Sequence, residues 1–203
     1  MAFITLTLPR TDRPRRARVP CLRATLLAAL LVGAGQGTAL AQGFSVQSAA
    51  TELKDKVFVL SARIEYQFSE DTLEALENGV PLFIGVDIEV LRERRWWWDD
   101  SIAKLGQRYL LLYHALSEKY VVHNLNSGAQ SNFSYLSAAL DALGKIDELP
   151  LIDESFLGSK GKFIGRIRAY LDIESLPAPV RPLAYLSPNW RLESDWFRWS
   201  LNP

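Results

Sequence analysis

Residues 57–68 read VFVLSARIEYQF, and residues 82–91 read LFIGVDIEVL. Both stretches alternate apolar and polar side chains with a period of two, which is typical of a strand that buries one face. Between them, Ser69 is a helix-capping residue, and Asn78 with Gly79 is a typical helix end. The region therefore predicts two half-buried strands joined by one short helix.

Further strands are predicted along the rest of the chain, at about 101–116, 119–125, 163–173 and 190–199. A second short helix is predicted at 134–143, where apolar residues recur at helical spacing before a glycine. Pro177, Pro179 and Pro182 predict a loop or short helix at 176–188. Residues 42–56 are predicted as an irregular lead-in, and 144–158 as a loose connection.

The fold class that these elements predict is mostly β. Short turns favour antiparallel pairing, and the two helical connections are too short for a full set of parallel crossovers. We therefore expect an antiparallel β-sandwich of about six strands, with two or three short helices in the connections. The alternative is an α+β fold with a single antiparallel sheet.

Residues 1–41 are predicted to be a signal peptide. They hold six arginines and one aspartate, followed by the mostly apolar run 24–34 and by Ala39-Leu40-Ala41. This pattern predicts cleavage between Ala41 and Gln42, export to the periplasm, and a single domain over 42–203. The apolar run is about half of the ~20 residues that span a bilayer, so an uncleaved anchor in the inner membrane is the alternative.

Composition excludes several classes of function. Residues 42–203 hold 17 basic and 22 acidic side chains, a formal charge of −5, so they lack the basic footprint of a nucleic-acid binder. The single cysteine, Cys21, precedes the predicted domain, which excludes disulfides and thiol catalysis from it. No phosphate-loop, nucleophile-elbow or HExxH motif occurs. We therefore expect no cofactor, no metal, no catalytic residue and no enzymatic activity.

A hydrolase remains a further hypothesis. His114 and His123 flank the turn at 117–118, and in a tight hairpin they would lie diagonally on one face. A zinc site would need further ligands, and none is evident, so ordinary strand histidines are the preferred interpretation. Carboxylates such as Asp87 and Glu89 are plentiful, but their spacing is that of solvated strand faces.

The most unusual segment is Arg94-Arg95-Trp96-Trp97-Trp98. Arginine and tryptophan are frequent anchors of protein interfaces, and both also suit a membrane surface. This segment is therefore a candidate binding edge for a partner or for peripheral membrane contact. The other interpretation is a strand end whose alternate tryptophans enter the core.

The remaining tryptophans, Trp190, Trp196 and Trp199, lie near the C-terminus. One interpretation joins them with residues 96–98 in a single aromatic layer of the core. The other makes the two clusters a shared aromatic binding patch, with Trp190 and Trp196 as candidate contact residues. Exposure of the rings distinguishes the two, since large exposed aromatic patches are uncommon on monomers.

Several stretches together resemble the DUF4390 family of exported proteobacterial proteins of unknown function. They are EALENGVPL at 74–82, RRWWWD at 94–99, YHALS at 113–117, LDALG at 140–144 and WRLESDW at 190–196. The resemblance implies export and a single domain, and it brings no established activity or catalytic residue. Members are often encoded beside a membrane sensor histidine kinase, which suggests a periplasmic accessory to envelope signalling.

Two functions are therefore expected from the sequence. The first is a non-enzymatic interaction module that docks on an envelope membrane protein such as a sensor kinase. The alternative is a small-ligand-binding protein with an aromatic cleft between the two tryptophan clusters.

Overall fold

The computed structural model describes residues 43–93, 100–157 and 161–201. Nine strands form within these residues: β1 (Gly43–Lys54), β2 (Val57–Gln67), β3 (Leu82–Arg92), β4 (Asp100–His114), β5 (Lys119–Asn124), β6 (Gln130–Phe133), β7 (Lys145–Asp153), β8 (Phe163–Leu171) and β9 (Phe197–Leu201). Six short helical segments connect them: α2 (Glu70–Glu77), α3 (Leu136–Leu143), η1 (Glu154–Phe156), η2 (Ile173–Ser175), α4 (Arg181–Leu186) and η3 (Pro188–Trp190).

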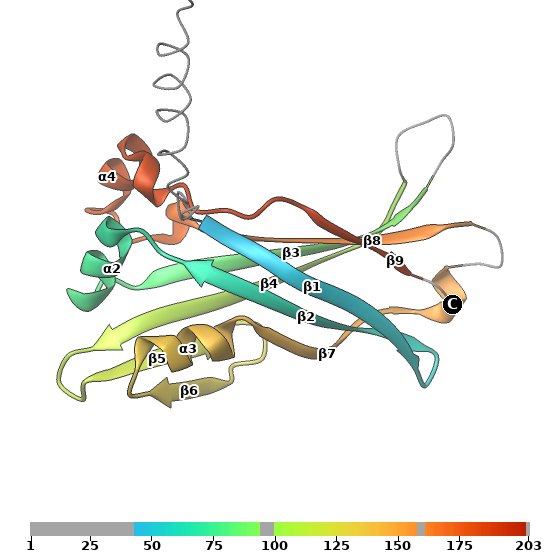
Figure 1. Cartoon of the computed structure of the whole chain (residues 1–203), viewed down its shortest axis with the longest axis horizontal. Helices are drawn as coiled ribbons and strands as arrows, with labels where there is room; N and C mark the ends of the chain where they lie inside the picture. Colours follow the sequence, from blue (N-terminus) through green and yellow to red (C-terminus); the bar gives the residue numbers. More distant parts are fainter. Residues whose placement is uncertain (1–42, 94–99, 158–160, 202–203) are drawn as a thin grey trace, which may run out of the picture. The chain divides into compact units, whose positions relative to one another are not determined.

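The strands form two antiparallel sheets. The first has the order β1-β2-β7, and the second has the order β6-β5-β4-β3-β8-β9. The three-stranded sheet lies over one face of the six-stranded sheet, with α2 and α4 together at one end (Figure 1). This arrangement confirms the prediction of a mostly-β, sandwich-like fold with few short helices.

The core lies between the facing sides of the two sheets. Phe58 and Leu60 of β2 are completely buried, and so are the alternate residues Ile84, Val86 and Ile88 of β3. Full burial of a side chain of this size contributes about 1.5–3 kcal/mol, so the period-two pattern of these strands supplies much of the folding free energy. The intervening polar residues of β3 are left on the opposite, outer face of the six-stranded sheet.

The predicted helix boundaries follow local chemistry. The Ser69 side chain accepts a hydrogen bond from the Thr72 amide at the start of α2, and Gly79 after its end has φ of 80°. Gly144 ends α3 where the chain approaches β2, and its carbonyl accepts from the Ile64 amide at 2.8 Å. A Cβ at Gly144 would collide with the Ile64 carbonyl. Among the described residues, no helix is long and apolar enough to cross a membrane.

The predicted lead-in at 42–56 is wrong, because residues 43–54 form the long strand β1. Phe44 and Val46 face the core, but a register shift between Val46 and Ser48 then interrupts the alternation. After that shift, Ala49 packs against the core. A bulge of this kind hides a strand from a period-two search.

Two other strands were also absent from the prediction, and one was misplaced. β7 lies in the predicted loose connection, where Pro150 and two register shifts against β2 break its pattern. β6 is a short, polar edge strand. The last strand begins at Phe197 instead of Trp190, because residues 188–190 form η3.

The core contains a tyrosine hydroxyl that is left without a hydrogen-bond partner by the described residues. The Tyr66 hydroxyl is buried and has no hydrogen-bond partner among the described residues, while its ring packs edge-on against Phe44 at 4.8 Å between centroids. Burial, with a smaller effect of the neighbouring Tyr109, raises the pKa of Tyr66 far above its ordinary value. An unpaired hydroxyl at such a site costs on the order of 1–3 kcal/mol.

Replacing Tyr66 with phenylalanine should therefore raise the free energy of unfolding at pH 7 by about 1 kcal/mol. A raised pKa in the folded state means that ionisation favours the unfolded chain, so the wild type loses stability as the pH rises above about 10. Tyr66→Phe should lose less, by up to about 1.4 kcal/mol per pH unit. Urea unfolding between neutral and alkaline pH measures both effects. Tyr185→Phe, which changes a half-exposed ring, is the control, and equal pH dependence in Tyr66→Phe and wild type would contradict the account.

Candidate functional site on the outer face of the six-stranded sheet

The outer face of the six-stranded sheet carries a group of charged and aromatic side chains, which we call the outer-face cluster. Its members are Asp87 and Glu89 of β3, Lys104 and Arg108 of β4, Arg166, Arg168 and Tyr170 of β8, and Trp196, which precedes β9. The strand register brings them together. Asp87 lies opposite Arg168, and Glu89 lies between Lys104 and Arg166. Directly opposite residues share a face of the sheet, so the two acidic residues of β3 lie next to basic residues of both neighbouring strands, β4 and β8.

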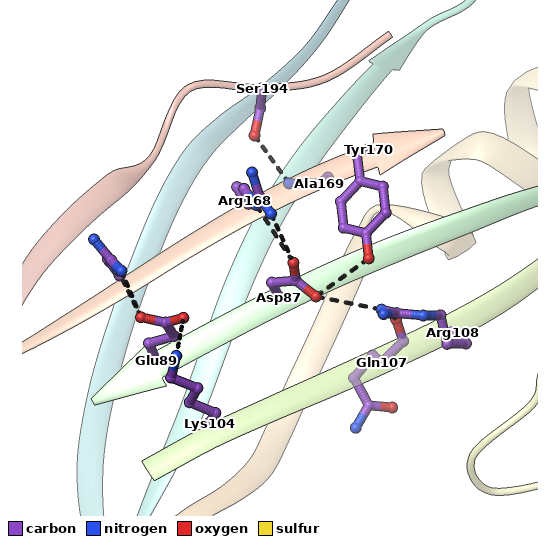
Figure 2. A network of polar contacts seen from close by, with 10 residues as sticks. Asp87, Glu89, Lys104, Gln107, Arg108, Arg168, Ala169, Tyr170 and Ser194 are labelled. Carbon is purple, nitrogen blue, oxygen red and sulfur yellow. Dashed lines mark hydrogen bonds and ion pairs between the residues drawn. The ribbon is translucent and has the colours of Figure 1, made fainter. Parts of the chain in front are cut away.

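Asp87 is the centre of the first group of contacts (Figure 2). Its Oδ2 atom accepts a hydrogen bond from Arg168 Nη2 at 3.1 Å. Its Oδ1 atom accepts from Arg108 Nη1 and from the Tyr170 hydroxyl, both at 3.4 Å. Burial raises the pKa of Tyr170, and the Asp87 charge adds to this, so the phenol stays a hydrogen-bond donor.

Glu89 makes the tightest pair of the cluster. Its Oε2 atom accepts from both Arg166 Nε at 3.0 Å and Arg166 Nη2 at 2.6 Å, and Lys104 Nζ lies 3.4 Å from Oε1. The Glu89 side chain is only 13% exposed. Because water and salt reach this pair less than they reach a fully exposed one, we expect it to be stronger than a typical surface salt bridge.

Trp196 covers two of the arginines. The centre of its ring lies 4.4 Å from Arg166 Cζ and 4.8 Å from Arg168 Cζ. These distances are within the range of cation–π attraction, worth roughly 0.5–2 kcal/mol. The tryptophan ring and both guanidinium groups are therefore held in fixed orientations.

Tyr170 forms the other aromatic contact of the cluster. Its ring centre lies 5.4 Å from Arg108 Cζ and 5.3 Å from Arg168 Cζ. The ring lies across Gly85, where an added Cβ would be 2.5 Å from Tyr170 Cζ. A glycine at this position of β3 thus makes room for the ring to lie against the sheet.

The cluster has an excess of positive charge on an otherwise acidic domain. Arg198 of β9 lies opposite Arg166 and is exposed, which gives five cations with the four already described, against the carboxylates of Asp87 and Glu89, of Glu193 opposite Tyr170, and of Asp172, whose charge acts on Tyr170. Lys104 is 67% exposed and Arg168 is 36% exposed at the side chain. The face therefore presents accessible cations next to a tryptophan ring.

The three described tryptophans lie in different surroundings, so they do not form one aromatic layer. Trp190 is buried in η3 next to α2. Trp196 lies over the arginines. Trp199 faces inward over Gly165, and its Nε1 donates to Thr51 Oγ1 of β1 at 3.3 Å. Strands β3 and β9 are also not neighbours, because β8 separates them.

The other predicted contact residues, Arg94, Arg95, Trp96, Trp97 and Trp98, lie outside the described residues, in the connection between β3 and β4. Their role stays a prediction.

The two histidines are not diagonal neighbours. The hairpin loop spans 115–118, so His114 lies opposite Lys119, while His123 lies opposite Leu110. Leu110 and His114 are four positions apart along β4, a distance of about 13 Å. His114 Nδ1 instead lies 3.1 Å from Ser117 Oγ. In the part of the chain that the structure describes, no group of three or more His, Cys, Asp or Glu side chains could hold a metal ion.

The sequence contains one signal for the outer-face cluster, a pair of acidic residues on one strand and a pair of basic residues on another. Asp87 and Glu89 are separated by one inward residue, and so are Arg166 and Arg168. Two strands with such complementary pairs on their polar faces are expected to lie side by side. The partners are 77 to 81 residues apart in the chain, so local patterns alone do not connect them.

The charge network predicts a measurable coupling between Asp87 and Arg168. In a double-mutant cycle with Asp87→Asn and Arg168→Gln, we expect a coupling of about 1 kcal/mol in the free energy of unfolding, since both groups are partly shielded from water. The coupling should fall in 1 M salt, where the Debye length is about 3 Å. Lys54 and Glu148, an exposed pair at 2.5 Å, are the comparison, for which a smaller coupling is expected. No coupling between Asp87 and Arg168 would contradict the account.

Residues 41–200 match the family described as "Domain of unknown function (DUF4390)", and this region includes the whole outer-face cluster. Comparison with curated proteins and with solved structures gave no match. The family match covers most of the 203 residues and agrees with the resemblance found in the sequence. The chain belongs to the DUF4390 family.

Proposed function

We propose that this protein is an exported, non-enzymatic interaction module that docks on a membrane protein of the bacterial envelope. The family resemblance suggests a sensor histidine kinase as that partner. The observation that carries the proposal is the outer-face cluster, in which Trp196 and the two arginines it stacks on lie partly exposed and already oriented on one face of a sheet.

Tryptophan, tyrosine and arginine are the residues that most often dominate the binding energy of an interface. Ordering a flexible side chain on binding costs roughly 0.5–1.5 kcal/mol. Trp196 stacks on Arg166 and Arg168, and Glu89 fixes Arg166, so much of this ordering is present before a partner arrives. Such preorganisation favours tight and specific docking.

The charges of the face indicate what kind of partner surface would fit. Asp87 and Glu89 are engaged with arginines of the same cluster. Lys104 and Arg198 lie exposed at its edges. An acidic partner surface would complement the net positive charge and would accelerate association at low salt.

The non-enzymatic part of the proposal is supported by the sequence, which holds no catalytic motif. The carboxylates of Asp87 and Glu89 are also already occupied by arginine donors of the same cluster.

Arg94, Arg95 and Trp96–98 stay candidate contacts for the same partner or for the membrane surface. The small-ligand alternative places a ligand between the two tryptophan clusters. It also depends on residues 96–98 and therefore stays a prediction.

Export predicts a processed chain. Protein recovered from the periplasmic fraction should begin at Gln42 on N-terminal sequencing, because Ala39 and Ala41 give the small-x-small pattern that a signal peptidase requires. Ala39→Asp should block processing and leave the longer chain in the membrane fraction. Recovery of unprocessed wild type from the membrane would support the anchored alternative, and recovery from the cytoplasm would contradict export.

Docking through the outer face predicts position-specific capture. A photo-crosslinking amino acid in place of Arg198 should trap one envelope membrane protein in producing cells, while the same probe in place of Glu118, an exposed residue of the β4–β5 hairpin, should not. Trp196→Ala should reduce trapping at position 198 at least about tenfold, since hot-spot tryptophans contribute roughly 2 kcal/mol or more.

Equal trapping at both positions, or trapping unaffected by Trp196→Ala, would contradict docking through this face. Vesicles of phosphatidylglycerol and phosphatidylethanolamine distinguish a lipid surface from a protein partner. Binding to these vesicles that is lost in Trp196→Ala, without a trapped protein, would replace the protein partner with peripheral membrane contact.

A further inference from the structure

A second surface lies at the end of the domain where α2 and α4 come together (Figure 1). A cleft of ≈ 540 Å³ runs between α2 on one side and α4 with η3 on the other. Buried Trp190 lines it together with Val180, Leu183 and Leu186. None of its lining residues belongs to the outer-face cluster.

The two walls of the cleft are joined by hydrogen bonds. Asp71 Oδ2 at the start of α2 accepts from Asn189 Nδ2 at 3.0 Å and from Ser187 Oγ at 3.4 Å. Ser69 Oγ donates to the Asn189 carbonyl at 2.8 Å. These contacts hold the chain after α4 against the N-terminal end of α2 and so fix the two walls of the cleft relative to each other.

The α4 wall exposes large apolar side chains. Leu186 is 83% exposed and Leu183 is 67% exposed, and Tyr185 beside them is 50% exposed. Leu183 and Leu186 lie about one helical turn apart and both line the apolar cleft, whereas isolated exposed leucines are common on any surface. An exposed apolar pair beside an apolar cleft is typical of a contact site for another molecule.

The α2 wall supplies negative charge. The helix has four acidic residues and no basic residue, and Asp71 and Glu74 line the cleft. Asp71 is used to hold the walls together, while the Glu74 side chain lies exposed at the rim without a described partner. A carboxylate beside an apolar groove attracts cations and repels anionic surfaces.

We propose that this cleft binds an apolar segment of a partner protein that carries lysine or arginine next to its apolar side chains. The apolar side chains would cover Leu183 and Leu186, and the cation would lie near Glu74. The negative rim disfavours anionic lipid as the occupant. The inference concerns a site separate from the outer-face cluster and does not depend on the docking proposed there.

The test uses a short helical peptide of leucine and lysine, and a matched peptide with glutamate at every lysine position. Titration calorimetry with protein expressed from the full sequence should show binding of the lysine peptide at least about tenfold tighter than the glutamate peptide, the size expected for 1.4 kcal/mol of charge preference. Equal affinity for both peptides, or no binding of either, would overturn the proposal.

Matched variants locate the binding on the protein. Leu183→Ser combined with Leu186→Ser should weaken binding of the lysine peptide at least about tenfold, because burial of two leucines is lost. Phe156→Ser is the control, because it also removes an exposed apolar ring, which is 71% exposed, but at a distant position. Phe156 lies on η1, next to the turn between β1 and β2, whereas α2 follows the opposite end of β2.

Charge reversal gives an independent test. Glu74→Lys should reverse the preference between the two peptides, while Glu154→Lys on η1 should leave it unchanged. Affinities unaffected by the leucine or Glu74 changes would overturn the assignment to this cleft. Binding of phosphatidylglycerol vesicles that depends on Leu183 and Leu186, without binding of the lysine peptide, would overturn it in favour of a lipid surface.

Discussion

The alternation of side chains along β3 is the constraint on which both faces of the six-stranded sheet depend. Ile84, Val86 and Ile88 are completely buried on one side, while Asp87 and Glu89 lie on the other. A slip of one residue against β4 or β8 would place both carboxylates in the core. Such a slip costs far more than any single contact on the outer face contributes. The core therefore fixes the register, and the register places the carboxylates beside the arginines of β8.

The outer-face cluster contributes more to geometry than to stability. Partly exposed ion pairs contribute about 0–1 kcal/mol each, which is small compared with the apolar core beneath them. Their main effect is on the orientation of the arginine side chains, because Glu89 binds Arg166, and Trp196 lies over Arg166 and Arg168. A protein that required only solubility on this face would not require a tryptophan at this position. This is why the cluster supports an interaction role.

Much of the sandwich was predictable from local patterns, and the rest depends on long-range contacts. β2, β3 and α2 were found because their alternation and capping residues are regular. β1 was missed because a bulge between Val46 and Ser48 interrupts its pattern, and β7 was missed because Pro150 and two register shifts do the same. Trp196 was a candidate contact residue from the sequence, and its role in binding stays a prediction, whereas the arginines beneath it were not candidates, because their position depends on the pairing of β3 with β8. The role of residues 94–98 lies outside what the described residues test.

The proposed docking requires that a partner covers the outer face with Trp196 in the cell. Hydroxyl-radical footprinting of Trp196, compared between purified protein and producing cells, tests this most directly. Trp199, whose ring faces the interior of the sandwich, serves as the internal reference. We expect Trp196 to be oxidised in the purified protein and protected in cells, with Trp199 changing little. Equal oxidation of Trp196 in both samples would contradict the account, because it would show that nothing covers this face in the envelope.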